Sequence, residues 1–178
     1  PNSAIDNRAF IKMNRGSFSD PRVKTKFGDA WLSVDLLITE GKRFDSIIVD
    51  LPDPNHPDLN KLYSTGFYNK LRNVLTGDGA LVVQSTSPYH AKRTFLSIGK
   101  TIEASGFSQV DQYHANVPSF GEWGWTIAVP LGTAPETRIK NFKAPLPESW
   151  ANTEMLDASF VFGHNFFSNK QQININRT

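Results

Sequence analysis

Two aspartates in a stiff loop are the residues of this sequence best suited to chemistry. Asp50 directly follows the β-branched run 47–49, and Asp53 comes three positions later between Pro52 and Pro54. Proline fixes its own φ and disfavours helix in the residue before it, so this loop is stiff. An aspartate after a strand is often only a turn former or a helix cap. Two of them in a proline-stiffened loop favour a functional site, because carboxylates accept protons and hydrogen bonds.

A buried strand is expected to present this loop. The run 47–49 shows no polar alternation, which predicts a strand covered on both faces in a parallel sheet. A second apolar run, 80–84, ends in Gln84 and is followed by three hydroxyl residues. Open α/β sheets bind their ligands at the carboxyl ends of the strands, so we expect both carboxylates at the ligand-binding edge.

The remaining periodicity predicts helices over residues 3–13, 31–38, 62–75, 88–104 and 152–162, and strands over 23–27, 107–117 and 125–129. Gly77-Asp-Gly79 is expected to end the third helix, and Thr153 to cap the last one. Helix-linked parallel strands followed by a strand pair predict a Rossmann-like α/β fold with an antiparallel carboxyl-terminal hairpin. Many enzymes that use S-adenosylmethionine have this arrangement.

The chain is expected to divide at residue 131. Residues 1–131 would form the Rossmann-like domain, truncated at its amino-terminal strands. Residues 132–178 would form an extension with a proline-rich extended connector, the last helix and a carboxyl-terminal end. We expect that end, from residue 171, to be poorly ordered or to form an edge segment.

Composition sets wide limits on function. The 178 residues suit one domain, and 39% hydrophobic with 20% charged residues excludes a disordered chain. A net charge of +2 with scattered basic residues gives no indication of a nucleic-acid partner. The lack of cysteine excludes disulfides and thiolate chemistry, and the four histidines lack metal-ligand spacing, so no metal is expected.

No apolar run approaches the roughly 20 residues of a membrane span. We therefore expect a cytoplasmic protein without membrane contact. The sequence starts with a proline rather than methionine, which favours a longer parent protein.

Six short motifs, in this order and spacing, resemble the polyamine aminopropyltransferases, the family of spermidine synthase. They span most of residues 14–130: Asp20-Pro-Arg22-Val23, Gly28-Asp29-Ala30, Asp50-Leu-Pro-Asp53-Pro54, Leu62-Tyr-Ser64 with Phe67-Tyr68, Gly79-Ala-Leu-Val-Val-Gln84, and Pro118 to Trp125. Each motif alone is weak, but their joint order is specific. The resemblance implies transfer of the aminopropyl group of decarboxylated S-adenosylmethionine to putrescine or a related polyamine. The nucleoside would be a co-substrate, and no tightly bound cofactor is expected.

The resemblance also implies roles for single residues. An amine with a pKa near 10 has no free lone pair at neutral pH, and Asp50 would be the base that removes its proton. The resemblance implies that the polyamine is bound by four residues, Asp53, Gln84, Tyr63 and Phe120. It implies that Asp29 and Ala30 lie at the adenine amino group. Each has a structural alternative: Asp29 as a helix cap, Gln84 as an ordinary strand end, and Tyr63 and Phe120 as packing aromatics.

The sequence departs from the family in two places. Phe120 stands where a polyamine-contacting tyrosine is common, which leaves the acceptor open. The family's glycine-rich first turn, its acidic ribose-binding residue and its amino-terminal β-domain have no counterpart here. We therefore expect the chain alone to bind nucleoside poorly and to be inactive. The edge of strand 47–49 would then lack a neighbour, and we expect either the amino-terminal segment or a second copy, in a homo-oligomer, to cover it.

Two other functions remain open. A methyltransferase of the same fold would need only one acid in the loop. A non-catalytic module would keep the carboxylates to bind a polyamine or a partner chain. Similar loops occur in bacterial relatives that carry a membrane-spanning region, so a membrane-tethered parent is a further alternative to a cytoplasmic protein.

Overall fold

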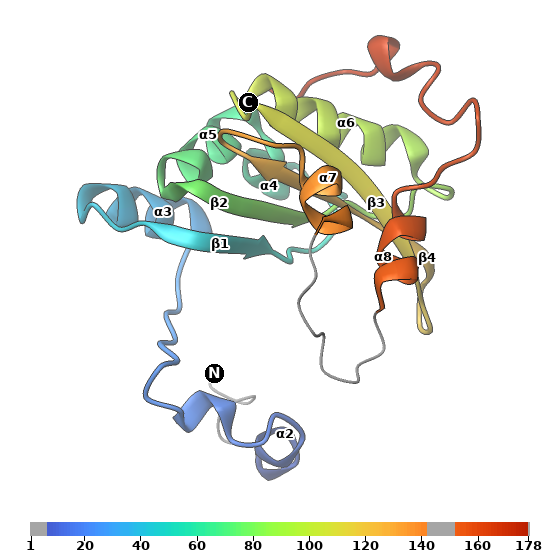
Figure 1. Ribbon diagram of the computed structural model, residues 1–178. Helices are drawn as coiled ribbons and strands as arrows, with labels where there is room; N and C mark the ends of the chain where they lie inside the picture. Colours follow the sequence, from blue (N-terminus) through green and yellow to red (C-terminus); the bar gives the residue numbers. More distant parts are fainter. Residues whose placement is uncertain (1–6, 142–151, 178) are drawn as a thin grey trace.

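A four-stranded sheet forms the centre of the protein. The computed structural model describes residues 7–141 and 152–177. The strands are β1 (Phe44–Val49), β2 (Leu75–Gln84), β3 (Gln109–Val117) and β4 (Gly121–Val129), in the order β1-β2-β4-β3. β1 and β2 pair in parallel, whereas β4 runs antiparallel to β2 and forms a hairpin with β3 (Figure 1). The predicted Rossmann-like fold with an antiparallel carboxyl-terminal hairpin is confirmed.

The helices follow the chain around this sheet. Before β1 lie α2 (Arg8–Met13), η1 (Ser17–Ser19) and α3 (Ala30–Thr39); between β1 and β2 lie α4 (Pro57–Asn60), η2 (Lys61–Tyr63) and α5 (Thr65–Asn73). After β2 come α6 (Lys92–Ala104), α7 (Pro135–Lys140), α8 (Thr153–Ser159) and η3 (Lys170–Gln172). Helix α6 starts four residues later than predicted, and residues 3–6 of the first predicted helix lie outside the described residues.

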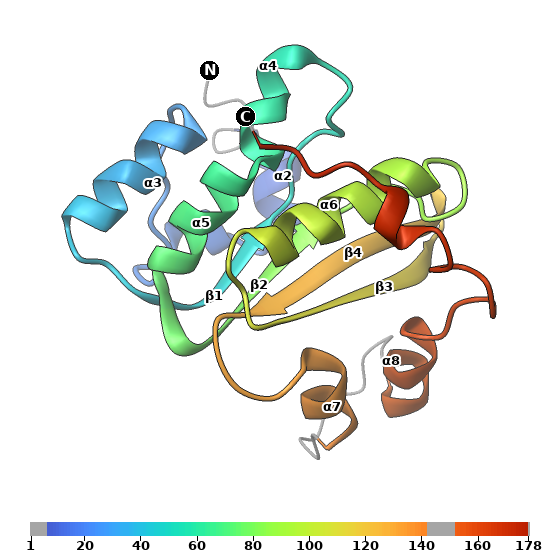
Figure 2. The ribbon, with the colours of Figure 1, turned by 90° about the horizontal axis from the view of Figure 1, so that it is seen from above.

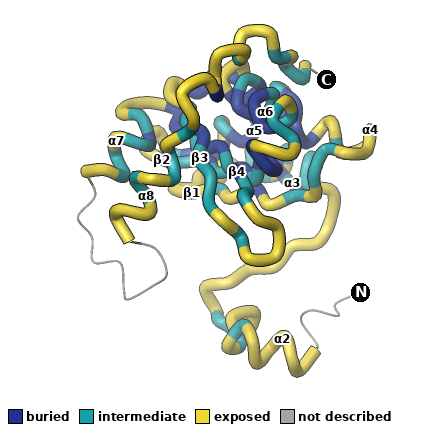
Figure 3. The backbone as a smooth tube through the Cα atoms, turned by 90° about the vertical axis from the view of Figure 1, so that its right-hand side faces the viewer, coloured by how far each residue is buried: buried dark blue, intermediate teal, exposed yellow. Residues whose placement is uncertain are grey.

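Helices α3, α5 and α6 cover one face of the sheet and form the main core with it. Buried side chains from each layer meet there: Val34, Phe67, Leu71, Leu81, Val83, Ile98 and Ile102. Figure 3 shows the buried residues gathered at α5, α6 and the adjoining strands. Burial of apolar surface on this side is the main force that holds the three helices against the strands.

Helices α7 and α8 lie on the other face. On β3, Gln112 contacts α6 through its bond to the Phe95 carbonyl, whereas the ring of Tyr113 lies 5.5 Å from that of Phe160, just after α8. Neighbouring residues of a strand point to opposite faces, so the two sets of helices are on opposite sides of the hairpin (Figure 2). The prediction of an extended connector is wrong over α7, because Pro135 is its first residue, where proline fits a helix.

The strand that carries the aspartate loop is not covered on both faces as predicted. Val49 is buried, but Ile48 is 76% exposed, because the helices packed near β1 lie on one face only. The predicted strand over residues 23–27 is also wrong. Those residues are exposed and belong to no strand of the sheet, because an alternating pattern alone does not form a strand where neither face is buried.

The predicted end of the third helix is wrong as well. Gly77-Asp-Gly79 lies inside β2, and α5 ends earlier, at Asn73. The pairing of β1 with β2 shifts between Phe44 and Ser46, which marks a bulge. A Cβ at Gly79 would lie only 3.1 Å from the Asp45 carbonyl oxygen. The glycine therefore permits the close approach of the two strands at this bulge.

The carboxyl-terminal end is neither poorly ordered nor a segment at the edge of the sheet. Through residue 177 it lies along α6, and its carbonyl groups accept hydrogen bonds from Lys100 and Ser97. Helix α8 is capped by Asn152, whose side chain accepts from the Met155 amide at 2.8 Å, rather than by Thr153. The proposed division of the chain at residue 131 stays a prediction.

The free edge of β1 leads to a testable prediction about association. Residues 7–29 form no strand along this edge, and its cover by a second copy stays a prediction. We expect Ile48→Lys to weaken that association, because it places a charge on an exposed apolar edge strand. Chromatography with light scattering tests this. A wild-type chain that stays monomeric at high concentration would contradict it.

Candidate active site

The aspartate loop and the end of β2 lie side by side at the carboxyl edge of the parallel strands. Val49 pairs with Val83, so Asp50 and Gln84 follow at the same level on neighbouring strands. On the other side of β2, Gln84 pairs with Trp125. The register therefore brings together residues that lie more than 30 positions apart in sequence.

The carboxylate of Asp53 is held by two neutral donors. Gln84 Nε2 donates to Oδ1 at 2.8 Å, and Thr86 Oγ1 donates to Oδ2 at 3.2 Å. The Gln84 Oε1 atom accepts from the Thr86 amide at 3.0 Å, which fixes the amide side chain in turn. A carboxylate accepts up to about four hydrogen bonds, so this one keeps acceptor capacity for a cation. The two bonds fix the orientation of the carboxylate but do not neutralise its negative charge.

Asp50 is exposed, and its carboxylate has no hydrogen-bond or ion-pair partner among residues 7–141 and 152–177. In the same described part of the chain, neither loop aspartate pairs with arginine or lysine. The Tyr63 hydroxyl contacts the loop backbone between the two aspartates, and both carboxylates contribute to raising its pKa. Two negative charges without an ionic partner in one short loop form a local site for a cation.

Tyr63 supports the loop from behind. Its hydroxyl donates to the Pro52 carbonyl at 2.9 Å and to the Leu51 carbonyl at 3.3 Å, and the residue is only 3% exposed. Burial, followed by the charges of Asp53 and Asp50, raises the pKa of the Tyr63 phenol well above 10. The hydroxyl therefore stays protonated and donating at neutral pH. Contact of Tyr63 with substrate stays a prediction, since its hydroxyl is engaged by the loop backbone.

Thr86 is a site residue that the sequence analysis missed. It is buried, and its φ of 62° lies in the left-handed region, which a β-branched residue rarely adopts. Its carbonyl accepts from the Gly124 amide at 2.8 Å, and this bond fixes the strained turn against β4. Strain of this kind is concentrated at functional sites. The only signal in the sequence was the run of three hydroxyl residues after Gln84.

Asp29 and Ala30 stand at the start of α3. The Asp29 Oδ1 atom accepts from the Leu32 amide at 3.2 Å as a helix cap, and its Oδ2 atom pairs with Lys61 Nζ at 2.8 Å. Helix α3 leads back into β1, so this amino-terminal end faces the same edge as Asp50. Asp29 therefore does act as a helix cap, which was the structural alternative, and its contact with adenine stays a prediction.

The Asp29–Lys61 pair leads to an expected pH effect. The Lys61 hydrogen bond, assisted by the Leu32 amide, lowers the pKa of Asp29 from 3.8. A carboxyl whose pKa is lower in the folded state stabilises the fold above its unfolded pKa and loses this contribution as the pH falls through the folded value. We expect Asp29→Asn to reduce stability at pH 7 more than at pH 2.5, measured by urea unfolding. A difference that stays constant with pH would contradict the role of the pair.

Phe120 lies in the turn of the β3–β4 hairpin. Because Gln84 pairs with Trp125, the residues before Trp125 extend past the carboxyl end of β2, toward the edge that carries Asp50. The Phe120 ring is 64% exposed, and its centre lies 5.2 Å from that of Trp123. An exposed phenylalanine packed against a partly buried tryptophan at this edge suits contact with the methylene chain of an amine, but this contact stays a prediction.

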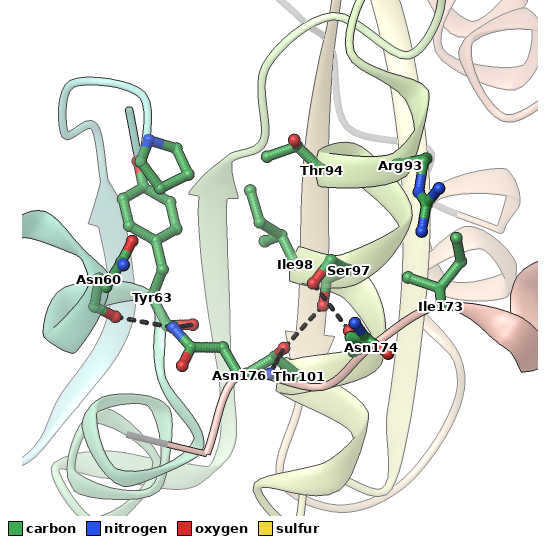
Figure 4. A pocket seen from close by; sticks show the side chains of 11 residues that line it. Asn60, Tyr63, Arg93, Thr94, Ser97, Ile98, Thr101, Ile173, Asn174 and Asn176 are labelled. Carbon is green, nitrogen blue, oxygen red and sulfur yellow. Dashed lines mark hydrogen bonds between the residues drawn. The ribbon is translucent and has the colours of Figure 1, made fainter. Parts of the chain in front are cut away.

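A pocket of about 320 Å³ lies behind the loop, between η2, α6 and the carboxyl-terminal segment (Figure 4). It is lined by Pro54 and Tyr63 on one side and by α6 residues such as Ser97 and Thr101 on the other. Asp50 and Asp53 are not among its lining residues. The pocket is therefore separate from the carboxylate site and touches it only through Pro54 and Tyr63.

The described residues show no group of three or more histidine, aspartate or glutamate side chains placed to hold a metal ion. Within the same part of the chain, none of the helices has the length and apolar character needed to cross a bilayer. A membrane-tethered parent protein stays an untested alternative.

Solved structures share this fold. A spermidine synthase in complex with the transition-state analogue AdoDATO superposes with a TM-score of 0.71 at 23% identity, over 94% of this chain and 57% of that one. The spermidine synthase of Thermotoga maritima superposes with a TM-score of 0.69 at 21% identity, over 94% of this chain and 56% of its own. These likenesses define the class: a Rossmann-like α/β protein of the type found in spermidine synthases.

The sequence comparisons define the family. Residues 3–141 match the spermine/spermidine synthase domain. A polyamine aminopropyltransferase of Shewanella oneidensis is 48% identical over 171 residues, 96% of this chain and 30% of that protein. Polyamine aminopropyltransferase 1 of Streptomyces coelicolor is 40% identical over 153 residues, 85% of this chain and 27% of that protein. The chain belongs to the spermine/spermidine synthase family, and it spans about 30% of the length of these relatives.

Proposed function

We propose that this chain provides the amine-activating part of a polyamine aminopropyltransferase. The single observation that carries the proposal is the carboxylate pair at the edge of the sheet. Asp53 is oriented by Gln84 and Thr86, and Asp50 has no hydrogen-bond or ion-pair partner in the described part of the chain. A cationic amine would supply the missing positive charge. The curated relatives carry the name of this activity.

The reaction would begin with a protonated amine bound at the two carboxylates. Asp53 would hold the ammonium group by charge-assisted hydrogen bonds, while Gln84 and Thr86 keep its oxygens aimed at the edge. Asp50 would take one proton and free the nitrogen lone pair. Because its carboxylate is exposed, it can return that proton to water after each turnover.

The group transferred would come from decarboxylated S-adenosylmethionine, used as a co-substrate. The nitrogen attacks the methylene group next to the sulfonium, a carbon–nitrogen bond forms, and the carbon–sulfur bond breaks with its electron pair left on sulfur. The products are the aminopropylated amine, 5′-methylthioadenosine and the proton taken by Asp50. Asp29 and Ala30, at the same edge, are the residues of this chain proposed to face adenine.

The test is an assay of the intact gene product with putrescine or spermidine as acceptor. We expect 5′-methylthioadenosine and aminopropylated amine to form in equal amounts from decarboxylated S-adenosylmethionine. Ordinary S-adenosylmethionine in the same assay is the control. Methyl transfer from it, with S-adenosylhomocysteine as product, would replace the proposal by a methyltransferase. Amine binding without any transfer would indicate a non-catalytic module.

A further inference from the structure

The carboxyl-terminal segment binds tightly to the helices that support the aspartate loop. We call residues 173–177 the C-terminal strap. Lys100 Nζ donates to the Ile173 carbonyl at 2.8 Å, Ser97 Oγ donates to the Asn174 carbonyl at 2.8 Å, and the Asn176 amide donates to Thr101 Oγ1 at 3.0 Å. Three successive contacts with α6 give the strap one defined path along this helix. Figure 4 shows those of Asn174 and Asn176.

Asn176 extends from this strap to the joint between η2 and α5. Its Nδ2 atom donates to the Asn60 carbonyl at 2.8 Å and to the Tyr63 carbonyl at 3.2 Å, and its own carbonyl accepts from the Thr65 amide at 2.9 Å. Ser64 is extended, with ψ of 161°, so the chain breaks between the two helices there. The break leaves the Tyr63 carbonyl at the end of η2 without an intrahelical donor, and Asn176 donates to it. The second bond of Asn176 joins the strap to Asn60, the residue before η2.

The same joint holds the aspartate loop. Tyr63 is the last residue of η2, and its hydroxyl donates to the carbonyls of Leu51 and Pro52 between the two aspartates. Backbone hydrogen bonds within the loop do little to fix it in the described structure. The Asn55 amide donates to the Asp53 carbonyl at 2.7 Å, but this bond spans only the second half of the loop. The register of β1 fixes the start of the loop and the bonds of Asp53 fix its second half, so the Tyr63 hydroxyl is what holds the backbone between the two aspartates.

We propose that Asn176 is a positioning residue for the aspartate loop and acts through Tyr63. The contacts run from the strap to the η2–α5 joint, then through the Tyr63 hydroxyl to the backbone of the loop. This inference rests on the proposed function, since it assigns the strap a role in amine activation. Misplacement of a catalytic group by about 1 Å can reduce a rate by about 100-fold, so support of this kind matters for turnover.

The first experiment compares Asn176→Asp with Asn174→Ala. The aspartate has nearly the same shape, but it puts a negative oxygen where an N–H group donated to two carbonyls. Asn174 lies in the same strap and binds Ser97 through its backbone carbonyl, so its alanine variant keeps that bond. Hydrogen exchange of the peptide that covers residues 50–56 is followed in both. We expect at least tenfold faster exchange in Asn176→Asp and no change in Asn174→Ala.

This readout needs no substrate, so it is independent of the proposed function. If exchange of the loop peptide stays unchanged in Asn176→Asp while the strap itself exchanges faster, the inference is overturned. If the loop exchanges faster but the wild-type gene product transfers no aminopropyl group, the proposed function fails and the coupling of the strap to the loop stands.

The second experiment tests the route through Tyr63 by steady-state kinetics of the intact gene product. We expect Asn176→Asp to lower kcat about tenfold and to leave the KM for decarboxylated S-adenosylmethionine within twofold. Tyr63→Phe removes the hydroxyl that holds the loop. If Asn176 acts through that hydroxyl, the double variant is no slower than Tyr63→Phe alone. Additive effects of the two substitutions would overturn the route.

Discussion

Replacement of Asp50 by asparagine is expected to lower the turnover of the intact gene product by about 10²- to 10⁴-fold, the usual contribution of a general base. The carboxamide has the same size but cannot take a proton from the amine. Amine affinity is expected to change only a few-fold, because Asp53 keeps its orienting bonds to Gln84 and Thr86. Turnover is measured by 5′-methylthioadenosine release, and affinity by calorimetry.

The matched control is Asp45→Asn, at the opposite end of the same strand. Asp45 is exposed and accepts a hydrogen bond from Thr76, a contact that an asparagine oxygen can also accept. This variant is expected to keep wild-type turnover. An Asp50→Asn enzyme that retains turnover within tenfold of wild type would show that another group removes the proton.

The second large effect is expected from Gly124→Ala, which acts on the fold beside the site. An added Cβ would lie 2.5 Å from a ring carbon of Phe95 and 2.9 Å from the Thr86 carbonyl oxygen. The ring is fully buried and the carbonyl belongs to a hydrogen-bonded turn, so neither has room to move. Overpacking of this kind costs about 1–3 kcal/mol. For a chain of this size we expect the melting temperature to fall by about 3–10 °C.

Gly77→Ala is the control for that substitution. Gly77 also lies in the sheet, but its nearest neighbour would be a Leu131 side-chain carbon at 4.0 Å, an ordinary contact. Because alanine has fewer unfolded conformations than glycine, this variant is expected to be neutral or slightly more stable. Equal melting temperatures for the two alanine variants, measured by calorimetry, would contradict the packing argument.

Sequence patterns correctly predicted the helices whose apolar face is buried in the core and the strands that pair with a neighbour close in sequence. The apolar face of α5 and the buried run of α6 face a real core, and the hairpin joins strands that are close in sequence. The burial of β1 was mispredicted, because an apolar run does not show which side a helix will cover. The start of β2 was also mispredicted, since two glycines in a bulge have the same local pattern as a helix stop.

Some residues of the candidate site could be predicted from the sequence and others could not. Asp50 and Gln84 were found because they stand at the ends of apolar runs, and Asp53 because it lies between two prolines of the same loop; the parallel register then brings all three to one edge. Thr86 was not found as a site residue, because its contact with Asp53 depends on a backbone conformation that its residue type disfavours. Asn176 was not found, because its partners at Asn60 and Tyr63 lie more than 110 positions away.

The left-handed backbone of Thr86 sets two selective pressures against each other. Glycine at this position would adopt the same φ without steric cost, but it would add freedom to the unfolded chain and leave a gap where a buried side chain packs. It would also delete the hydroxyl that orients Asp53. Relief of backbone strain alone is therefore not expected to be selected at this residue.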